Sequence, residues 1–103
     1  MIPQIILGTF QNKRYEDLLG VVDAAINNGC TAFDTAPSYG TETDLGRARK
    51  ACMDKYGIKR TDLYVSDKVD AWQMIKHKGD VRCFVTDAIR KMDVEYMDIV
   101  WIH

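Results

Sequence analysis

The sequence predicts an α/β fold in which parallel strands alternate with helices. Short apolar runs of strand length recur along the 103 residues. Between them lie longer segments whose apolar residues repeat with the period of a helix. The resulting order, βαβαβαβ, favours parallel strands joined by right-handed crossovers, with three helices on one face of the sheet. No low-complexity segment or linker interrupts residues 1–103, so we expect a single unit.

The first half of the chain contains two predicted strands and two predicted helices. The strands are short apolar runs that stop at Gly8 and Asp34, and they cover residues 5–7 and 31–33. The helices have apolar residues at helical spacing and end near glycines, and they cover residues 15–28 and 41–56. Thr41 is the expected N-cap of the second helix, because acidic residues follow it in the first turn.

The second half contains two further strands and one helix. One strand covers residues 63–66 and runs into Lys68, and the other covers residues 97–102 and ends at His103. A polar loop is expected after Lys68, up to Gly79 and Asp80. The helix that follows has an apolar stripe at helical spacing, formed by Val81, Phe84, Val85, Ala88, Ile89 and Met92.

Composition excludes several classes of function. The 14 basic and 15 acidic residues give a net charge of −1, which predicts neither a nucleic-acid partner nor a membrane partner. Cys30, Cys52 and Cys83 are odd in number and widely spaced, which predicts neither disulfides nor a metal site. Reduced, mostly buried thiols are typical of a cytoplasmic protein. The N-terminus does not resemble a signal peptide, and no apolar run has the length of a membrane span.

Polar residues stand at the ends of three successive predicted strands. They are Asp34, Lys68 and His103, and Tyr39 lies in the loop after Asp34. Because the C-terminal ends of parallel strands share one edge of a sheet, we expect these four side chains within about 10 Å of one another. Enzymes built from parallel βα units carry their chemistry at that edge.

The four side chains suit proton transfer to a carbonyl oxygen. A lone tyrosine has a pKa of about 10, and a nearby ammonium favours its phenolate. Asp34 would keep Lys68 charged and oriented, and a neutral imidazole could donate a hydrogen bond to the substrate oxygen. Taken singly, each residue is better explained as a turn, cap or solvated residue, and His103 as a frayed terminus. Their joint placement at matching strand ends favours the catalytic interpretation.

The segment DTAPSYGTETDLG, residues 34–46, with LGTF at residues 7–10, resembles the N-terminal signature of the aldo-keto reductases. This resemblance implies that residues 1–103 are a partial domain, the N-terminal half of a (β/α)8 TIM barrel. It also implies NADPH-dependent reduction of an aldehyde or ketone, with Tyr39 as proton donor. The family's catalytic tetrad matches Asp34, Tyr39, Lys68 and His103.

The resemblance also suggests binding residues. Gly8 and Thr9, with Asp34, match positions near the nicotinamide. Phe10 and Trp72 are candidates for the substrate pocket, although ordinary packing explains them equally well. Two departures stand out: Asp67 occupies a position where the family usually has Thr or Ser, and the family's N-terminal hairpin is largely missing before residue 5.

The length of the chain limits what it is expected to do alone. A TIM barrel needs about 250 residues, and three and a half βα units are present. In the family, most contacts to the NADPH phosphates and adenine come from the C-terminal half. The 103 residues alone are therefore expected to be inactive, and either the missing half or self-association would cover the strand edges and an inner face near Val100 and Ile102. The alternative is a non-catalytic remnant or a regulatory or binding module of the same family.

Overall fold

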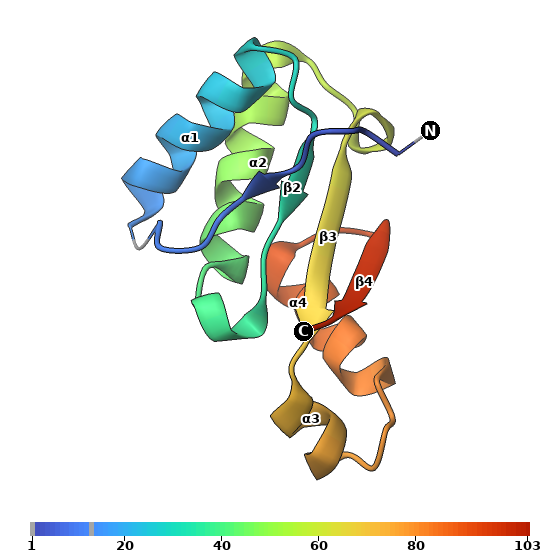
Figure 1. Ribbon diagram of the computed structural model, residues 1–103. Helices are drawn as coiled ribbons and strands as arrows, with labels where there is room; N and C mark the ends of the chain where they lie inside the picture. The colour runs from blue at the N-terminus through green and yellow to red at the C-terminus, as the bar shows by residue number, and fades with distance from the viewer. Residues whose placement is uncertain (1, 13) are drawn as a thin grey trace.

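A four-stranded parallel sheet organises the computed structural model, which describes residues 2–12 and 14–103. Its strand order, β1-β2-β3-β4, is the order in the sequence, and each neighbouring pair is parallel, as predicted (Figure 1). The strands are Leu7–Gly8, Ala32–Asp34, Tyr64–Val69 and Ile99–Ile102. The C-terminal ends of all four therefore lie at one edge.

Three crossover helices connect the strands and pack together on one face of the sheet (Figure 1). They are α1 (Tyr15–Asn27), α2 (Glu42–Tyr56) and α4 (Arg82–Met92). Two short 3-10 turns, Pro37–Tyr39 and Arg60–Asp62, complete the connections that follow β2 and α2. None of the helices in the described residues is long and apolar enough to cross a membrane.

A fourth helix, α3 (Ala71–Lys76), lies where the sequence predicted a polar loop. That prediction is wrong for these six residues. The segment AWQMIK is too short to show a helical period, but a side chain caps its first turn. Gln73 Oε1 accepts a hydrogen bond from the backbone N–H of Asp70 at 2.8 Å, so this helix begins immediately after β3.

The strand boundaries differ from the predicted ones because pairing decides them. β1 is confined to Leu7–Gly8, which pair with Phe33 and Asp34 of the three-residue strand β2. Ile5 and Ile6 therefore lie outside the sheet. β3 instead extends to Val69, because the partners of its last residues, Trp101 and Ile102, lie on β4. Pairing partners are distant in sequence, so local apolar runs cannot define such limits.

A buried ion pair fixes the start of β4. Asp98 Oδ2 accepts hydrogen bonds from Arg60 Nη2 and from the backbone N–H of Val65, both at 2.8 Å. The same guanidinium donates to the carbonyl of Tyr96 at 2.7 Å. Because Asp98 satisfies a backbone donor of β3 with its side chain, the regular ladder starts one residue later, at Ile99.

The hydrophobic core lies between the sheet and the helices, and the other face of the sheet carries no helix (Figure 1). Along β3, Val65 faces the core, whereas Ser66 and Lys68 face the open side. Ile99 and Trp101 pair with Ser66 and Lys68, so they share the open side.

The prediction that Val100 and Ile102 lie on that open inner face is wrong. They pair with Asp67 and Val69 and therefore share the helix-covered side of the sheet. Val100 also lines a small cavity with Phe84 of α4. Side chains along a strand alternate between the two faces of the sheet. Because the side chain of His103 points to the inner face, Trp101 and Ile99 share that face, whereas Ile102 and Val100 do not.

Candidate active site

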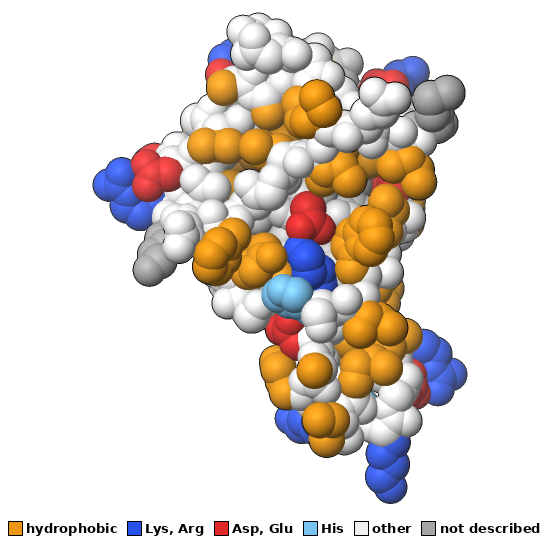
Figure 2. Space-filling view, in the orientation of Figure 1, with side chains coloured by type: hydrophobic (Ala, Val, Ile, Leu, Met, Phe, Trp, Pro, Cys, Tyr) orange, Lys and Arg blue, Asp and Glu red, His pale blue; other side chains and the backbone are white. Residues whose placement is uncertain are grey.

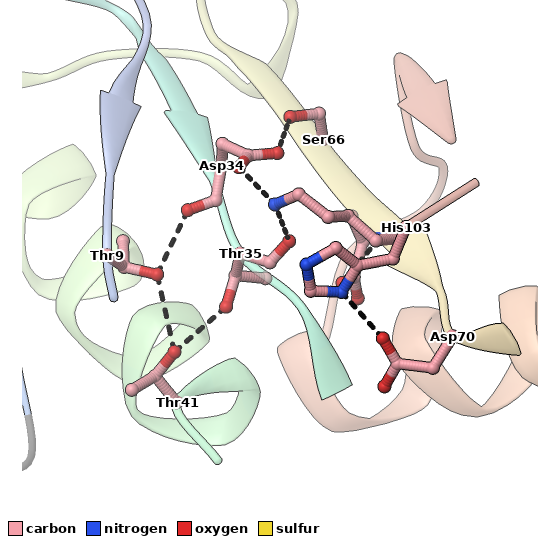
Figure 3. Close-up of polar contacts among 9 residues, drawn as sticks. Thr9, Asp34, Thr35, Thr41, Ser66, Asp70 and His103 are labelled. Atoms are coloured by element: carbon pink, nitrogen blue, oxygen red, sulfur yellow. Dashed lines mark hydrogen bonds and ion pairs between the residues drawn. The ribbon is translucent and has the colours of Figure 1, made fainter. Parts of the chain in front are cut away.

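The Lys68 ammonium forms an ion pair with Asp34 at the C-terminal edge of the sheet. Asp34 is the last residue of β2, and Lys68 is the second-last residue of β3. The same ammonium donates a hydrogen bond to the carbonyl oxygen of Thr35 at 2.9 Å (Figure 3). Both charged side chains are largely buried, so Lys68 is held in one position. The predicted salt bridge between the two residues is present.

Ser66 completes the environment of the Asp34 carboxylate. Its hydroxyl donates to Asp34 Oδ1 at 2.5 Å, while the other carboxylate oxygen pairs with Lys68 (Figure 3). Ser66 and Asp34 are direct partners in the β2–β3 register. Each oxygen of Asp34 therefore has its own donor, which fixes the plane of the carboxylate. Sequence reasoning missed Ser66, although it lies two residues before Lys68 and hence on the same face of the strand.

Tyr39 lies directly over the Lys68 ammonium. The ammonium is 4.8 Å from the centre of the Tyr39 ring, which ends the 3-10 turn after β2. Burial lowers the pKa of Lys68, but the hydrogen bonds and the charges that Asp34 and Tyr39 provide together raise it above its usual value. Lys68 therefore stays charged beside the phenol throughout the physiological pH range.

His103 is ordered at the end of β4. Its backbone N–H donates to the carbonyl of Val69 at 3.0 Å, which extends the β3–β4 pairing to the last residue. Its ring meets the Tyr39 ring edge-on, with 5.8 Å between the centroids. Its Nδ1 atom lies 2.6 Å from Asp70 Oδ1 (Figure 3). The four predicted tetrad side chains thus come together, and Asp70 is a neighbour that the sequence reasoning did not identify.

Three buried threonines form a hydrogen-bond network next to this edge of the sheet. Thr9 Oγ1 donates to the carbonyl oxygen of Asp34 at 2.9 Å and lies 3.3 Å from Thr41 Oγ1, which is 2.8 Å from Thr35 Oγ1 (Figure 3). Thr41 precedes α2 as predicted, but its hydroxyl makes no capping hydrogen bond to the helix, because the two other threonines engage it. Thr9 is fully buried and orients the backbone of Asp34.

The two candidate pocket aromatics differ in position. The Phe10 ring packs against Tyr39 with 5.0 Å between centroids, and its side chain is 62% exposed, so it can contact a molecule above the tetrad. Trp72 lies on α3, beyond the end of β3, and is 57% exposed. Among the described residues, no group of three side chains could hold a metal ion.

Asp67 points away from the tetrad, toward the helices. It is 2% exposed, and its Oδ1 atom accepts from the backbone N–H of Lys68 at 2.8 Å. Burial, first of all, and the negative charge of the neighbouring Glu42 raise the pKa of Asp67 to about 8. Glu42 is itself buried, 3.7 Å from the ammonium of Lys91. Asp67 is therefore protonated at neutral pH, and it does not compete with Asp34 for the Lys68 ammonium.

We expect Asp67→Asn to stabilise the protein, and the gain should depend on pH. Below about pH 3 the Asp67 carboxyl keeps its proton in both the folded and the unfolded state. Between about pH 4 and pH 8 the unfolded chain loses a proton that the folded chain retains, so the free energy of unfolding falls with rising pH and then levels. Asparagine has no such proton, so its advantage should grow across this window to about 2 kcal/mol or more.

Urea unfolding of both proteins between pH 4.5 and pH 9 measures this difference. Asp54→Asn, which changes an exposed carboxylate on α2, is the matched control and should stay within about 0.5 kcal/mol of the unmodified protein. A difference between Asp67→Asn and the unmodified protein that does not change with pH would contradict the buried, protonated state of Asp67.

The fold and the site together define a class of protein. Parallel βα units with a lysine, an aspartate, a tyrosine and a histidine at their C-terminal edge are typical of a portion of a TIM barrel. A profile of the Aldo/keto reductase family matches residues 4–103, and the chain belongs to this family. It is accordingly an oxidoreductase-family chain that carries the N-terminal part of the barrel.

Curated relatives agree with this assignment. The chain is 31% identical over 103 residues to the uncharacterized oxidoreductase YtbE of Bacillus subtilis, covering 99% of this chain and 36% of the relative. It is 31% identical over 103 residues to the D/L-glyceraldehyde reductase of Hypocrea jecorina, covering 99% of this chain and 30% of that protein. The chain thus spans about a third of the length of these relatives.

Solved structures show the same relationship. The aldose reductase from Schistosoma japonicum superposes with a TM-score of 0.86 at 26% identity, covering 99% of this chain and 33% of that one. MGS-M4, an aldo-keto reductase enzyme from a deep-sea metagenome library, superposes with a TM-score of 0.79 at 30% identity, covering 100% of this chain and 35% of that one. Almost every described residue therefore has a counterpart in a reductase barrel.

Proposed function

We propose that this chain supplies the proton-transfer part of an NADPH-dependent carbonyl reductase that converts an aldehyde or ketone to an alcohol. The observation that carries the proposal is the buried Lys68–Asp34 pair directly beneath the Tyr39 ring. A buried ammonium next to a phenol favours the phenolate that remains once the proton has left. Tyr39 is therefore the proton donor, Lys68 stabilises the charge left on its oxygen, and Asp34 holds Lys68 in place.

His103 is the second polar group beside the substrate oxygen. Its ring stands edge-on to Tyr39, and its Nδ1 atom is occupied by Asp70, so Nε2 is the nitrogen left for the substrate. Phe10 provides an apolar wall next to Tyr39. The carbonyl oxygen then lies between the phenol and the imidazole, where negative charge develops as the carbonyl carbon is reduced.

The nicotinamide end of the cofactor suits the residues present. A bound NADPH would supply the hydride for the carbonyl carbon. Gly8 pairs with Asp34 in the sheet, and a Cβ atom added at Gly8 would meet no atom within 4 Å. A flat ring can therefore approach the backbone of Gly8 beside the tetrad. Thr9 acts indirectly, because its buried hydroxyl holds the backbone of Asp34.

The uncovered face of the sheet defines what must complete the site. In Figure 2, acidic, basic and histidine side chains adjoin one another across this face, with hydrophobic side chains on both sides. The exposed hydrophobic residues include Ile6 and Trp101. The partner that fits this face is the remaining set of βα units of a barrel, which would add the sites for the NADPH phosphates and adenine. Self-association of the 103 residues would cover the same face without adding those sites.

The test compares the 103 residues alone with a barrel completed by a relative. Residues 1–103 are joined to the part of the Hypocrea jecorina D/L-glyceraldehyde reductase that follows the region matched here. We expect the joined protein to bind NADPH and to reduce an aldehyde such as glyceraldehyde. We expect the 103 residues alone to self-associate and to lack activity, as judged by sedimentation velocity, NADPH fluorescence titration and the oxidation of NADPH.

Two results would overturn the proposal. One is a monomeric 103-residue chain that binds NADPH and reduces the aldehyde, because the site would then need no completion. The other is a joined barrel that binds NADPH normally but does not reduce any aldehyde or ketone. That second result would favour a regulatory or binding module of the same family.

A further inference from the structure

Asp70 is a buried carboxylate next to the tetrad, at the N-cap position of α3. It lies between β3 and α3 and is 5% exposed. Its Oδ1 atom is 2.6 Å from His103 Nδ1, while its Oδ2 atom has no hydrogen-bond partner among the described residues (Figure 3). A buried carboxylate oxygen without a partner is costly. Because the fold accepts this cost, the contact with His103 is the interaction to explain.

The backbone holds both partners in register. The N–H of Asp70 donates to Gln73 Oε1 at 2.8 Å, which fixes Asp70 at the start of α3. The N–H of His103 donates to the carbonyl of Val69, the residue immediately before Asp70. Because Val69 pairs with the backbone of His103 and Asp70 is the next residue in the chain, the side chains of Asp70 and His103 lie next to each other.

The chemistry of the pair determines where the imidazole carries its proton. An ionised carboxylate can only accept hydrogen bonds, so its partner Nδ1 must be an N–H. When the ring is neutral, Nε2 then has a lone pair and accepts; when the ring is protonated, Nε2 is an N–H and donates. This differs from the neutral imidazole donor that the residue types alone suggested.

We propose that Asp70 is a positioning residue that fixes His103 with its proton on Nδ1 and presents Nε2 to the substrate oxygen site. The role of this site rests on the proposed reductase function, whereas the protonation pattern does not. His103 then donates to the substrate oxygen only as an imidazolium. The titratable groups that face its ring are Asp70 on one side and Tyr39 with Lys68 on the other.

Nitrogen-detected NMR of the imidazole rings tests this on the 103-residue chain, without any need for activity. We expect the neutral His103 ring to show the Nδ1–H form in the unmodified protein. In Asp70→Leu, which replaces the two carboxylate oxygens by methyl groups, His103 should change to the Nε2–H form that unconstrained side chains favour. His77 is the internal control, because its ring lies near Cys83 and Phe84, away from Asp70, and should not change.

Activity of the joined barrel supplies the second readout. Asp70→Leu should alter the pH profile of kcat with NADPH affinity unchanged, because the neutral ring of His103 then carries an N–H at Nε2 and can donate to the substrate oxygen without being protonated. Asp70→Glu, which keeps the carboxylate, should restore part of the Nδ1–H signal and of the original pH profile.

The outcomes separate the two proposals. An Nε2–H form in the unmodified protein, or an Nδ1–H form that survives Asp70→Leu in a folded chain, would overturn the role of Asp70 even in an active reductase. An Nδ1–H form that depends on Asp70, in a joined barrel that does not reduce carbonyls, would leave the positioning role intact and remove the proposed function. The tautomer is assigned by the nitrogen chemical shifts. Because an unfolded chain would also favour the Nε2–H form, circular dichroism must show that Asp70→Leu remains folded.

Discussion

Replacing Tyr39 by phenylalanine in the joined barrel is expected to lower the rate of carbonyl reduction by about 100-fold to 10,000-fold. NADPH affinity should stay near normal. The hydroxyl gives up its proton only as negative charge forms on the substrate oxygen, so its removal raises the energy of the transition state and spares the ground state. Steady-state kinetics with a fluorescence titration of NADPH measure both quantities.

Tyr39→Phe removes only the hydroxyl group. The aromatic ring of residue 39, which contacts Phe10, His103 and the Lys68 ammonium, is retained in phenylalanine. Tyr96→Phe is the matched control: Tyr96 lies before β4, at the other end of the sheet, and its ring, 4.0 Å from the Arg60 guanidinium, is also retained. Equal losses in the two variants, or a parallel loss of NADPH affinity in Tyr39→Phe, would argue against Tyr39 as the proton donor.

The order of elements could be predicted from the sequence because it depends on local patterns. The helical repeat of apolar residues identified α1, α2 and α4, and Gly57 ends α2 with a left-handed φ of 64° as expected. The limits of β1 and β3 depend instead on pairing partners that lie about 25 to 35 residues away. Local apolarity carries no information on such pairing, which is why those boundaries were wrong.

Part of the candidate site could also be predicted from the sequence. Asp34, Lys68 and His103 were found because each follows an apolar strand, and the shared edge of a parallel sheet then places them together. Ser66 could have been found by strand alternation from Lys68. Asp70 could not, because its contact with His103 depends on the short helix α3, whose start is fixed by Gln73.

Replacing glycine by alanine is expected to have opposite effects on stability at Gly46 and at Gly20. Gly46 is buried inside α2, and a Cβ atom added there would lie 2.7 Å from both the Cα atom and the carbonyl carbon of Met92, and closer still to its carbonyl oxygen. These are backbone atoms at the end of α4, which cannot move aside as a side chain can. Gly20 is exposed on α1, and a Cβ atom there would meet nothing within 4 Å.

We therefore expect Gly46→Ala to lower the free energy of unfolding by about 3 kcal/mol, although alanine is the better helix former. Gly20→Ala should raise it by about 0.5–1 kcal/mol, because only the helix propensity changes. Urea unfolding followed by circular dichroism measures both.

The consequence of Gly46→Ala should reach the tetrad. Met92 ends the helix that leads into β4, and its carbonyl also accepts a hydrogen bond from Arg49 Nη2 at 3.3 Å. Pushing α4 away from α2 therefore shifts the segment that carries His103 relative to Lys68 on β3. If Gly46→Ala proved as stable as Gly20→Ala, the close backbone contact between α2 and α4 would be wrong, and with it the placement of β4 that aligns His103 with Asp70.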